Sequence, residues 1–355
     1  MDHAARRARL VERLPGLGAD ALLVTRRPNV RYLSGFSGSN GQLVVSADRA
    51  VFLTDGRYTE QSRREAPDLE RTTYGSDLPK AFSEACRAVG ASRVAFEAEG
   101  MTYHQYTRFA ATGVELVPTT GQAEALRWVK EPEEHELIRA AQSVTDAAFE
   151  RVVGKLVEGA TEKEVAFELE AAMRREGADG VAFETIVAFG ENAAEPHHSP
   201  TDRPLGRGEM VKMDLGGLVG GYHADMTRTV AFGDPPARLR HVYEVVLAAQ
   251  RAGIDAVKAG AVAGACDEAA RAVIRDAGLG EAFTHSLGHG VGLEIHEPPW
   301  LRRGGEHVLP EGTVVTVEPG IYLDGVGGVR IEDMVEVTAD GCRPIATSPR
   351  ELLVL

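Results

Sequence analysis

A weak internal repeat restricts the fold of this sequence most, because two copies of one pattern imply two copies of one structural unit. Residues 159–177 (GATEKEVAFELEAAMRREG) and 260–278 (GAVAGACDEAARAVIRDAG) have the same length and a similar pattern. Thr161 and Glu164 have capping-box spacing and both segments end at glycine, so each predicts a helix. Downstream, GEMVKMDLGG (208–217) aligns with GTVVTVEPG (312–320). We predict two helix-plus-strand units folded face to face around a pseudo-twofold axis.

Four carboxylates occupy repeat-related positions. Asp214 aligns with Glu318, and Asp225 in HADMTRT lies roughly where GVRIEDM places Glu332. A single acid at a strand end commonly caps a turn, but four at equivalent places would meet in the folded pair. Such close like charges raise one another's pKa, and divalent cations would remove that penalty. Strand alternation puts a polar neighbour on the same face as three of them: Thr227, Thr316 and Arg330.

Eight of the eleven histidines follow residue 190, and three of them, His285, His289 and His296, lie in HSLGHGVGLEIHE. His285 and His289 have the spacing of a zincin helix, but no Glu follows His285 and three glycines argue against a helix. A glycine-rich strand or loop instead allows one histidine to be a ligand and others to donate hydrogen bonds. Four carboxylates with one imidazole form a hard, oxygen-rich set suited to a dinuclear Mn, Co or Zn site. Two such ions activate water and polarise a carbonyl, which favours hydrolysis.

Charge and composition exclude other classes of function. The net charge of -14 disfavours nucleic acid and anionic membranes as partners. No apolar stretch approaches the ~18 residues of a membrane helix, and no apolar segment follows the N-terminal arginines, so we expect a cytoplasmic protein. The odd number of cysteines, three, predicts buried free thiols. Neither a P-loop nor the serine of a nucleophile elbow is present.

The first third of the chain has the alternating pattern of an α/β domain. A helix is predicted over 6–14, and short apolar runs predict strands over 21–24, 42–45 and 50–54. SGFSGSNG (34–41) predicts a turn-rich loop, and TDGRYTEQ (54–61) a strand–turn–helix junction. The pattern of apolar segments ends near Thr119, and a long helix begins around Pro132. We therefore place the domains at 1–125 and 126–355.

In combination, MDLGG, ADMTRT, HSLGHGVGLEIHE, VEPGIY and GGVRIED resemble the pita-bread metallopeptidases, and within them the Xaa-Pro dipeptidases (prolidases) and Xaa-Pro aminopeptidases. NVRYLSGFSGSN and TDGRYTEQ resemble the smaller N-terminal domain of these proline peptidases, so the resemblance covers nearly the whole chain. It implies an α/β (α+β) protein with a C-terminal pita-bread domain preceded by a smaller α/β domain. It also implies a cofactor of two divalent metal ions, Mn, Co or Zn.

Carried over residue by residue, the resemblance makes five residues the metal ligands: Asp214, Asp225, His289, Glu318 and Glu332. Asp225 and Glu332 would bridge the two metals. The resemblance implies hydrolysis of Xaa–Pro bonds, with His296 or His197 steadying the oxyanion and Glu318 passing a proton to the leaving prolyl nitrogen.

Other positions are assigned by the same resemblance. His197, rather than His198, matches the family histidine that follows proline, and Arg330 matches the arginine before the last ligand. Tyr222 matches a tyrosine near the second aspartate and is expected at the substrate. Phe183 is expected to line the prolyl pocket.

The sequence departs from the prolidase pattern in HEPPWLRR. Trp300 stands where prolidases often place an arginine that binds a dipeptide carboxylate, with Arg302 and Arg303 further on. This leaves dipeptidase and aminopeptidase activity open, on Xaa-Pro dipeptides or short proline-containing peptides. A homodimer is expected because relatives are commonly dimers. Two alternatives are creatinase-like C–N hydrolysis and a non-catalytic pita-bread binding module, and the five intact ligands count against both.

Overall fold

The computed structural model describes residues 1–355 and divides into two compact units, Met1–Arg127 and Trp128–Leu355. Each unit has its own hydrophobic core. None of the helices combines the length and the apolarity needed to cross a bilayer.

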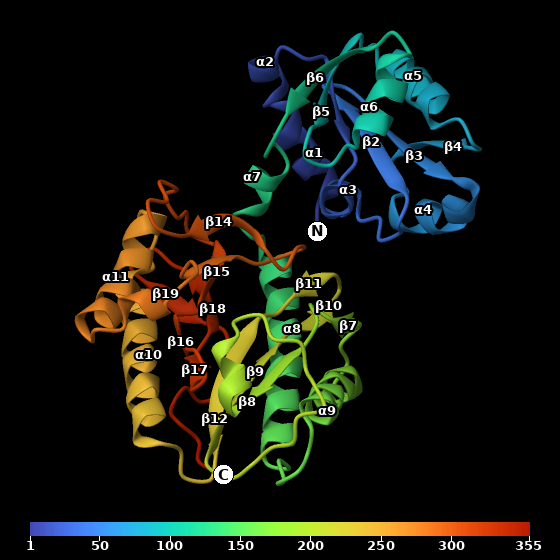
Figure 1. Ribbon diagram of the computed structural model, residues 1–355. Helices are drawn as coiled ribbons and strands as arrows, with labels where there is room; N and C mark the ends of the chain where they lie inside the picture. The colour runs from blue at the N-terminus through green and yellow to red at the C-terminus, as the bar shows by residue number, and fades with distance from the viewer. The chain divides into compact units, whose positions relative to one another are not determined.

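The N-terminal unit is built on one mixed sheet with the strand order β4-β3-β2-β1-β5-β6, and helices pack against it (Figure 1). β1 pairs antiparallel with β2 and parallel with β5, and all four of its residues are buried, as in a strand covered on both faces. The strands are β1 (Ala21–Val24), β2 (Gly41–Ser46), β3 (Ala50–Asp55), β4 (Glu70–Tyr74), β5 (Arg93–Glu97) and β6 (Glu115–Thr119). The helices are α1 (His3–Val11), α2 (Leu14–Leu17), α3 (Arg27–Ser34), α4 (Thr59–Glu65), α5 (Leu78–Ala88), α6 (Tyr103–Ala110) and α7 (Glu124–Arg127).

The first predicted helix differs from the observed one at both ends. It was expected over 6–14, but α1 begins at His3, where Asp2 caps it, and ends at Val11. The reason for the earlier end is Pro15, whose ring in a continued helix would clash with the carbonyl of Val11 four residues before it. The chain therefore restarts as α2, with proline in its first turn. The predicted strands, the loop before β2 and the strand–turn–helix junction after β3 are all present.

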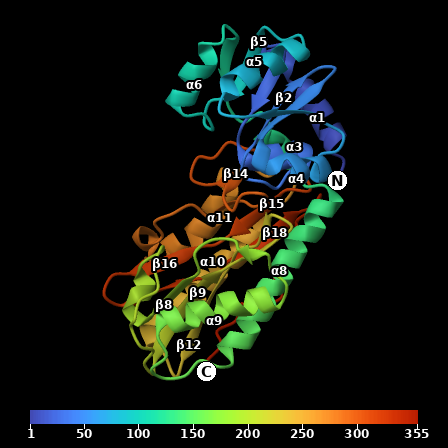
Figure 2. The same cartoon turned by 90° about the vertical axis from the view of Figure 1, so that its right-hand side faces the viewer.

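The C-terminal unit consists of two halves of the same design. In the first half, α8 (Pro132–Val153) and α9 (Glu162–Arg175) pack together and cover β8 (Ile186–Phe189), β9 (Glu209–Leu215) and β12 (Met226–Phe232). In the second, α10 (Ala237–Ala256) and α11 (Ala263–Asp276) cover β13 (Gly288–Gly290), β15 (Val314–Val317) and β18 (Asp333–Val337). The two helix pairs flank the strands from opposite sides (Figures 1 and 2).

The remaining elements of this unit are short. They are β7 (Gly180–Val181), β10 (Gly217–Val219), β11 (Tyr222–His223), β14 (Glu297–Leu301), β16 (Gly320–Leu323), β17 (Gly327–Arg330), β19 (Cys342–Pro344) and two 3-10 turns, of which Gly190–Ala194 concerns the site below. The sheets have the orders β12-β9-β8, β14-β13-β15-β18-β19, β11-β10-β7 and β16-β17.

The predicted repeat is therefore present in three dimensions. Helices α9 and α11 are both 14 residues long, and the capping box of Thr161 and Glu164 opens the first. The glycines after the two helices, Gly177 and Gly278, have positive φ angles of 107° and 76°, a conformation that side-chain-bearing residues rarely adopt. Strands β8, β9 and β12 have the same antiparallel order as β13, β15 and β18.

Candidate metal centre

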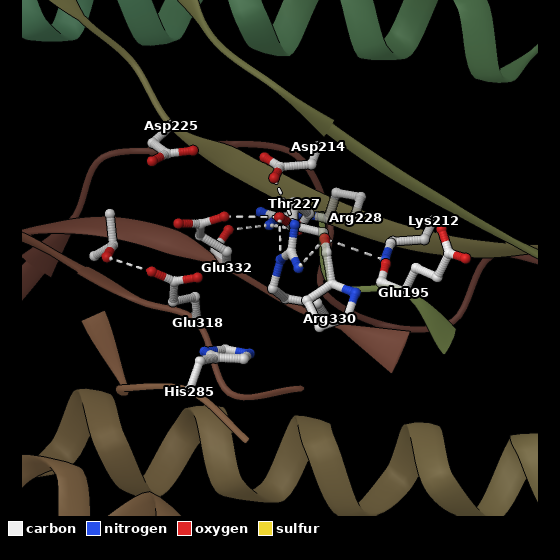
Figure 3. Close-up of polar contacts among 12 residues, drawn as sticks. Glu195, Lys212, Asp214, Asp225, Thr227, Arg228, His285, Glu318, Arg330 and Glu332 are labelled. Atoms are coloured by element: carbon white, nitrogen blue, oxygen red, sulfur yellow. Dashed lines mark hydrogen bonds and ion pairs between the residues drawn. The ribbon is translucent and has the colours of Figure 1, made fainter. Parts of the chain in front are cut away.

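The five predicted metal ligands come together from both halves of the repeat. Asp214 is near the end of β9, and Asp225 immediately precedes β12. Glu318 immediately follows β15 and Glu332 immediately precedes β18, so the two halves contribute carboxylates at equivalent places. His289 is the middle residue of β13. Figure 3 shows the four carboxylates grouped in one region of the domain, beside Arg330 and Thr227.

The imidazole of His289 is oriented for metal binding. Its Nδ1 lies 3.0 Å from the carbonyl oxygen of Gly290 and donates a hydrogen bond to it. This leaves Nε2 as the ligand atom, in the arrangement typical of metal-binding histidines. Nε2 lies 3.3 Å from Oε1 of Glu318 and 3.6 Å from Oδ2 of Asp225.

The centre is buried and rich in uncompensated carboxylate oxygen. Asp225, His289 and Glu332 are each at most 5% exposed, and one ligand atom from each lies within 4.8 Å of the others. Oδ1 of Asp214 and Oε1 of Glu332 are buried without any hydrogen-bond partner. Buried polar atoms are nearly always satisfied in native proteins, and carboxylate oxygens with one imidazole are a donor set for hard divalent ions. The residues therefore fit divalent metal.

The electrostatics agree with that fit. Burial, followed by the charges of neighbouring carboxylates, raises the pKa of Asp225 and of Glu332 well above the usual range. Burial also acts to raise the pKa of Glu318, but its hydrogen bond to His289 and the charges of His289 and Arg330 outweigh it and lower that pKa to about 2. A bound cation would stabilise the ionised form of all three acids.

Arg330 and Thr227 connect the carboxylates of the two halves. The guanidinium of Arg330 donates to Oδ2 of Asp214 through Nη2 and to the hydroxyl of Thr227 through Nε. Thr227 in turn donates to Oε2 of Glu332 at 2.7 Å. In the second half, Thr316 donates to Oε1 of Glu318 at 3.2 Å. Of the predicted neighbours, only Thr316 contacts the ligand two residues away, whereas Thr227 and Arg330 each contact a ligand of the other half. These contacts fix the directions in which the ligand oxygens point.

A cavity of about 530 Å³ opens onto the centre. All five ligands line it, together with His197, His285 and His296, and its apolar wall includes Phe183 and Trp300. The ring of His296 stands at 77° to that of His289, with 4.4 Å between centroids. Phe183 thus lines the cavity, and its place in a prolyl pocket stays a prediction.

The two adjacent histidines of EPHHSP have different surroundings. His198 is 6% exposed, and both its ring nitrogens are engaged, Nδ1 with Glu195 at 2.7 Å and Nε2 with Glu162 at 2.9 Å. His197 is exposed to the cavity. The structure thus leaves His197 free to meet a substrate and gives His198 a role in holding the chain.

Tyr222 is buried and does not line the cavity. Its side chain is 2% exposed, and its hydroxyl donates to Oε1 of Glu134 on α8 at 2.8 Å. It is not among the residues that line the cavity. The hydroxyl is thus committed to a buried carboxylate, and the expected role of Tyr222 in substrate binding stays a prediction.

The sequence assigned no role in the site to Tyr322 or to His285. Tyr322 accepts a hydrogen bond from Nη1 of Arg330 at 2.9 Å, and its hydroxyl lies 2.9 Å from Nε2 of His285. Nδ1 of His285 faces the carbonyl of Ser286 at 2.8 Å. A carbonyl oxygen only accepts, so Nδ1 is the donor there, and in the neutral ring Nε2 accepts from the hydroxyl of Tyr322. Burial lowers the pKa of His285 in agreement with that state. Only the position of His285 in the histidine cluster hinted at this contact.

Comparisons with known proteins extend over both units. Residues 136–339 match metallopeptidase family M24, and residues 6–129 match the creatinase/prolidase N-terminal domain. The Xaa-Pro dipeptidase of Pyrococcus furiosus is 36% identical over 352 residues, which cover 97% of this chain and 98% of that protein.

Solved structures show the same two-part architecture. An Xaa-Pro dipeptidase from Bacillus anthracis matches with a TM-score of 0.98 at 38% identity over 100% of both chains. An X-Pro aminopeptidase from Thermotoga maritima matches with a TM-score of 0.90 at 37% identity over 97% of this chain and 99% of that one. The predicted mixed α/β fold with a C-terminal pita-bread domain is confirmed. The chain therefore belongs to metallopeptidase family M24 and is a hydrolase that uses divalent metal.

Proposed function

We propose that this protein is a dinuclear-metal peptidase that hydrolyses Xaa-Pro bonds in dipeptides or short peptides. The observation that carries the proposal is the convergence of five ligand residues on one cavity, two of them with buried oxygens that have no partner. The Xaa-Pro names of the similar dipeptidase and aminopeptidase proteins support the substrate class. We propose two ions, of Mn, Co or Zn, because the ligands come in equivalent sets from the two halves.

The chain's own residues divide the work of hydrolysis. Bound divalent ions would supply an activated water and an electrophile for the scissile carbonyl. Glu318, whose carboxylate lies beside Nε2 of His289, takes up the proton and delivers it to the prolyl nitrogen. His197 and His296 face the cavity and donate hydrogen bonds to the oxyanion. Phe183 and Trp300 give the substrate apolar walls.

In an Xaa-Pro substrate the residue after the cleaved bond is proline, so the site cannot rely on a hydrogen bond from a backbone N–H group at that residue. Prolyl nitrogen carries no proton in a peptide, so a peptidase that relies on an N–H contact there binds it poorly. The positions that recognise substrate here are histidines and apolar side chains, neither of which requires that N–H group.

The decisive experiment compares Ala-Pro, Ala-Pro-Ala and Ala-Ala as substrates of protein that is stripped by a chelator and reloaded separately with Mn, Co or Zn. Metal-dependent cleavage of the two proline peptides without cleavage of Ala-Ala is expected. Cleavage of the dipeptide alone identifies a dipeptidase, and cleavage chiefly of the tripeptide identifies an aminopeptidase. No cleavage with any metal would refute the proposal and favour a binding module.

A pair of variants tests the ligand assignment. Asp225→Asn should lose both metal and activity. Asp234→Asn, which removes an exposed carboxylate paired with Arg240, is the matched control and should keep both. An active, metal-loaded Asp225→Asn protein would contradict the assignment of Asp225 as a ligand.

We further propose that the protein acts as a homodimer in the cytoplasm. The resemblance to proline peptidases supports the dimer, and the three free cysteines, Cys86, Cys266 and Cys342, suit a reducing compartment. Light scattering on the eluting peak of a size-exclusion column measures the mass, which should be twice the 38.1 kDa of one chain.

A further inference from the structure

Lys212 is a buried basic residue that the hydrolytic scheme above does not use. It is 0% exposed on β9, two residues before Asp214, and alternation places both side chains on the same face of the strand. Its Nζ donates to the backbone carbonyl oxygens of Ala193 at 3.2 Å, of Glu195 at a short distance, and of Pro196 at 3.5 Å. Figure 3 shows the amino group directed toward Glu195.

The three acceptors lie on the segment that immediately precedes His197. Burying an amino group is costly unless it is hydrogen-bonded. An apolar side chain at this buried position would stabilise the fold without that cost. The contacts therefore point to a requirement for one conformation of the residues before His197. The ring of Tyr322, 5.3 Å from Nζ, closes another side of the amino group.

The same segment is also fastened on both sides of these contacts. Glu162 accepts from the backbone N–H of Phe189 at 2.8 Å before the segment and from that of Thr201 at 2.9 Å after it. Arg330 donates to the carbonyl of Pro196 at 3.1 Å. His197 is thereby left as an exposed side chain on a backbone that is held from several directions.

We propose that Lys212 is a positioning residue that sets the place of His197 relative to the metal ligands. The physical basis is that β9 carries both the ligand Asp214 and the clamp Lys212, so one rigid strand fixes the distance between the metal centre and the His197 segment. Arg330 adds a second tie, because it binds both Asp214 and the carbonyl of Pro196. The inference rests on the proposed function, since His197 matters only if it meets a substrate.

A double-mutant cycle on the full-length, metal-loaded protein tests the inference. Lys212→Met removes the donors and keeps the length and the burial. It should lower kcat for Ala-Pro or Ala-Pro-Ala by about ten- to hundredfold, the usual effect of a misplaced catalytic group, with metal content unchanged. In a His197→Ala background the same substitution should change kcat by less than about twofold. Lys258→Met, which alters an exposed lysine of the same unit, should leave kcat unchanged.

Amide hydrogen exchange gives a readout that is independent of activity. In metal-free protein, Lys212→Met should speed exchange in the peptide covering 193–199 by at least about tenfold, without a similar change over 285–296. If Lys212→Met does not fold, Lys212→Gln, which is shorter and keeps N–H donors, is used in both measurements.

The results separate the inference from the function on which it rests. Losses that add fully with those of His197→Ala, or unchanged exchange over 193–199, would overturn the role of Lys212. Wild-type protein inactive on every proline peptide would instead refute the proposed function, while the exchange measurement would still test the clamp.

Discussion

Lys130 and Glu297 form a buried ion pair in the C-terminal unit whose disruption should lower the stability of that unit. Nζ of Lys130 lies 2.9 Å from Oε1 of Glu297, and the two side chains are 1% and 2% exposed. Lys130 precedes α8 and Glu297 begins β14, so the pair joins the start of the unit to the strand that follows His296. Lys130→Met should therefore remove the cation that lies 2.9 Å from a buried carboxylate.

The magnitude follows from the burial. Removing one partner of a buried pair costs about 3–5 kcal/mol, whereas replacing both partners by apolar side chains is often neutral or stabilising. Lys130→Met should therefore be strongly destabilising, and the double variant Lys130→Met/Glu297→Met should recover most of the loss. Lys163→Met is the matched control, because it breaks an ion pair with Asp202 whose side chains are 56% and 83% exposed, and should change little.

Urea unfolding followed by tryptophan fluorescence measures the effect. The two tryptophans, Trp128 and Trp300, both belong to the C-terminal unit, so the signal reports on that unit alone. A loss of 3–5 kcal/mol should lower the urea midpoint by roughly 1–2 M, given m-values that rise with protein size. A single variant as stable as the Lys163→Met control, or a double variant no more stable than the single one, would refute the reasoning.

Three further predictions concern the site and the core. Burial and the neighbouring carboxylates raise the pKa of Asp225, so the folded metal-free protein binds that proton more tightly than the unfolded chain. Its stability should therefore fall as pH rises through the folded-state pKa. Urea midpoints measured across about pH 5 to 8 should depend less on pH for Asp225→Asn than for the wild-type protein. An equally steep pH dependence in the variant would contradict the assignment of this effect to Asp225. Burial raises the pKa of Cys86 to about 12 and of Cys266 to about 11. A thiolate-selective disulfide reagent near pH 8 should thus label neither thiol before unfolding, and rapid labelling of native protein would contradict this. A Cβ added at Gly216 would lie 2.0 Å from the carbonyl oxygen of Ala224. Gly216→Ala should therefore cost about 3 kcal/mol or more and lower the metal content, and wild-type stability with full metal would argue against that clash.

Much of the metal centre was predictable because its signals are local and repeated. Asp214 and Glu318, like Asp225 and Glu332, occupy equivalent places in two copies of one pattern, and a repeated pattern folds into repeated elements. Spacing also pointed to Arg330 as a neighbour of the ligands, although it ends β17 and contacts Asp214 of the other half. The roles of the individual residues, such as metal ligand or proton carrier, came from the resemblance to the family and not from spacing.

The helices and strands were predictable to the same extent and for the same reason. The short strands of the first unit follow from their apolar runs, and the start of the helix from Pro132 to Val153 follows from a proline in its first turn. The first helix was wrong at its end, because a single proline acts on the residue four positions before it rather than on the periodic pattern.

The sequence by itself determined the repeat, the ligand types and the class of metal chemistry, since each depends on residue identity at short, regular spacing. Only the tertiary structure decided what each polar side chain contacts. It committed the hydroxyl of Tyr222 to Glu134, 88 residues away, and joined Tyr322 to His285 across 37 residues. It also directed Lys212 toward the backbone before His197. Such contacts join segments that are distant in the chain, and their partners are selected by how the elements pack, which no local pattern encodes.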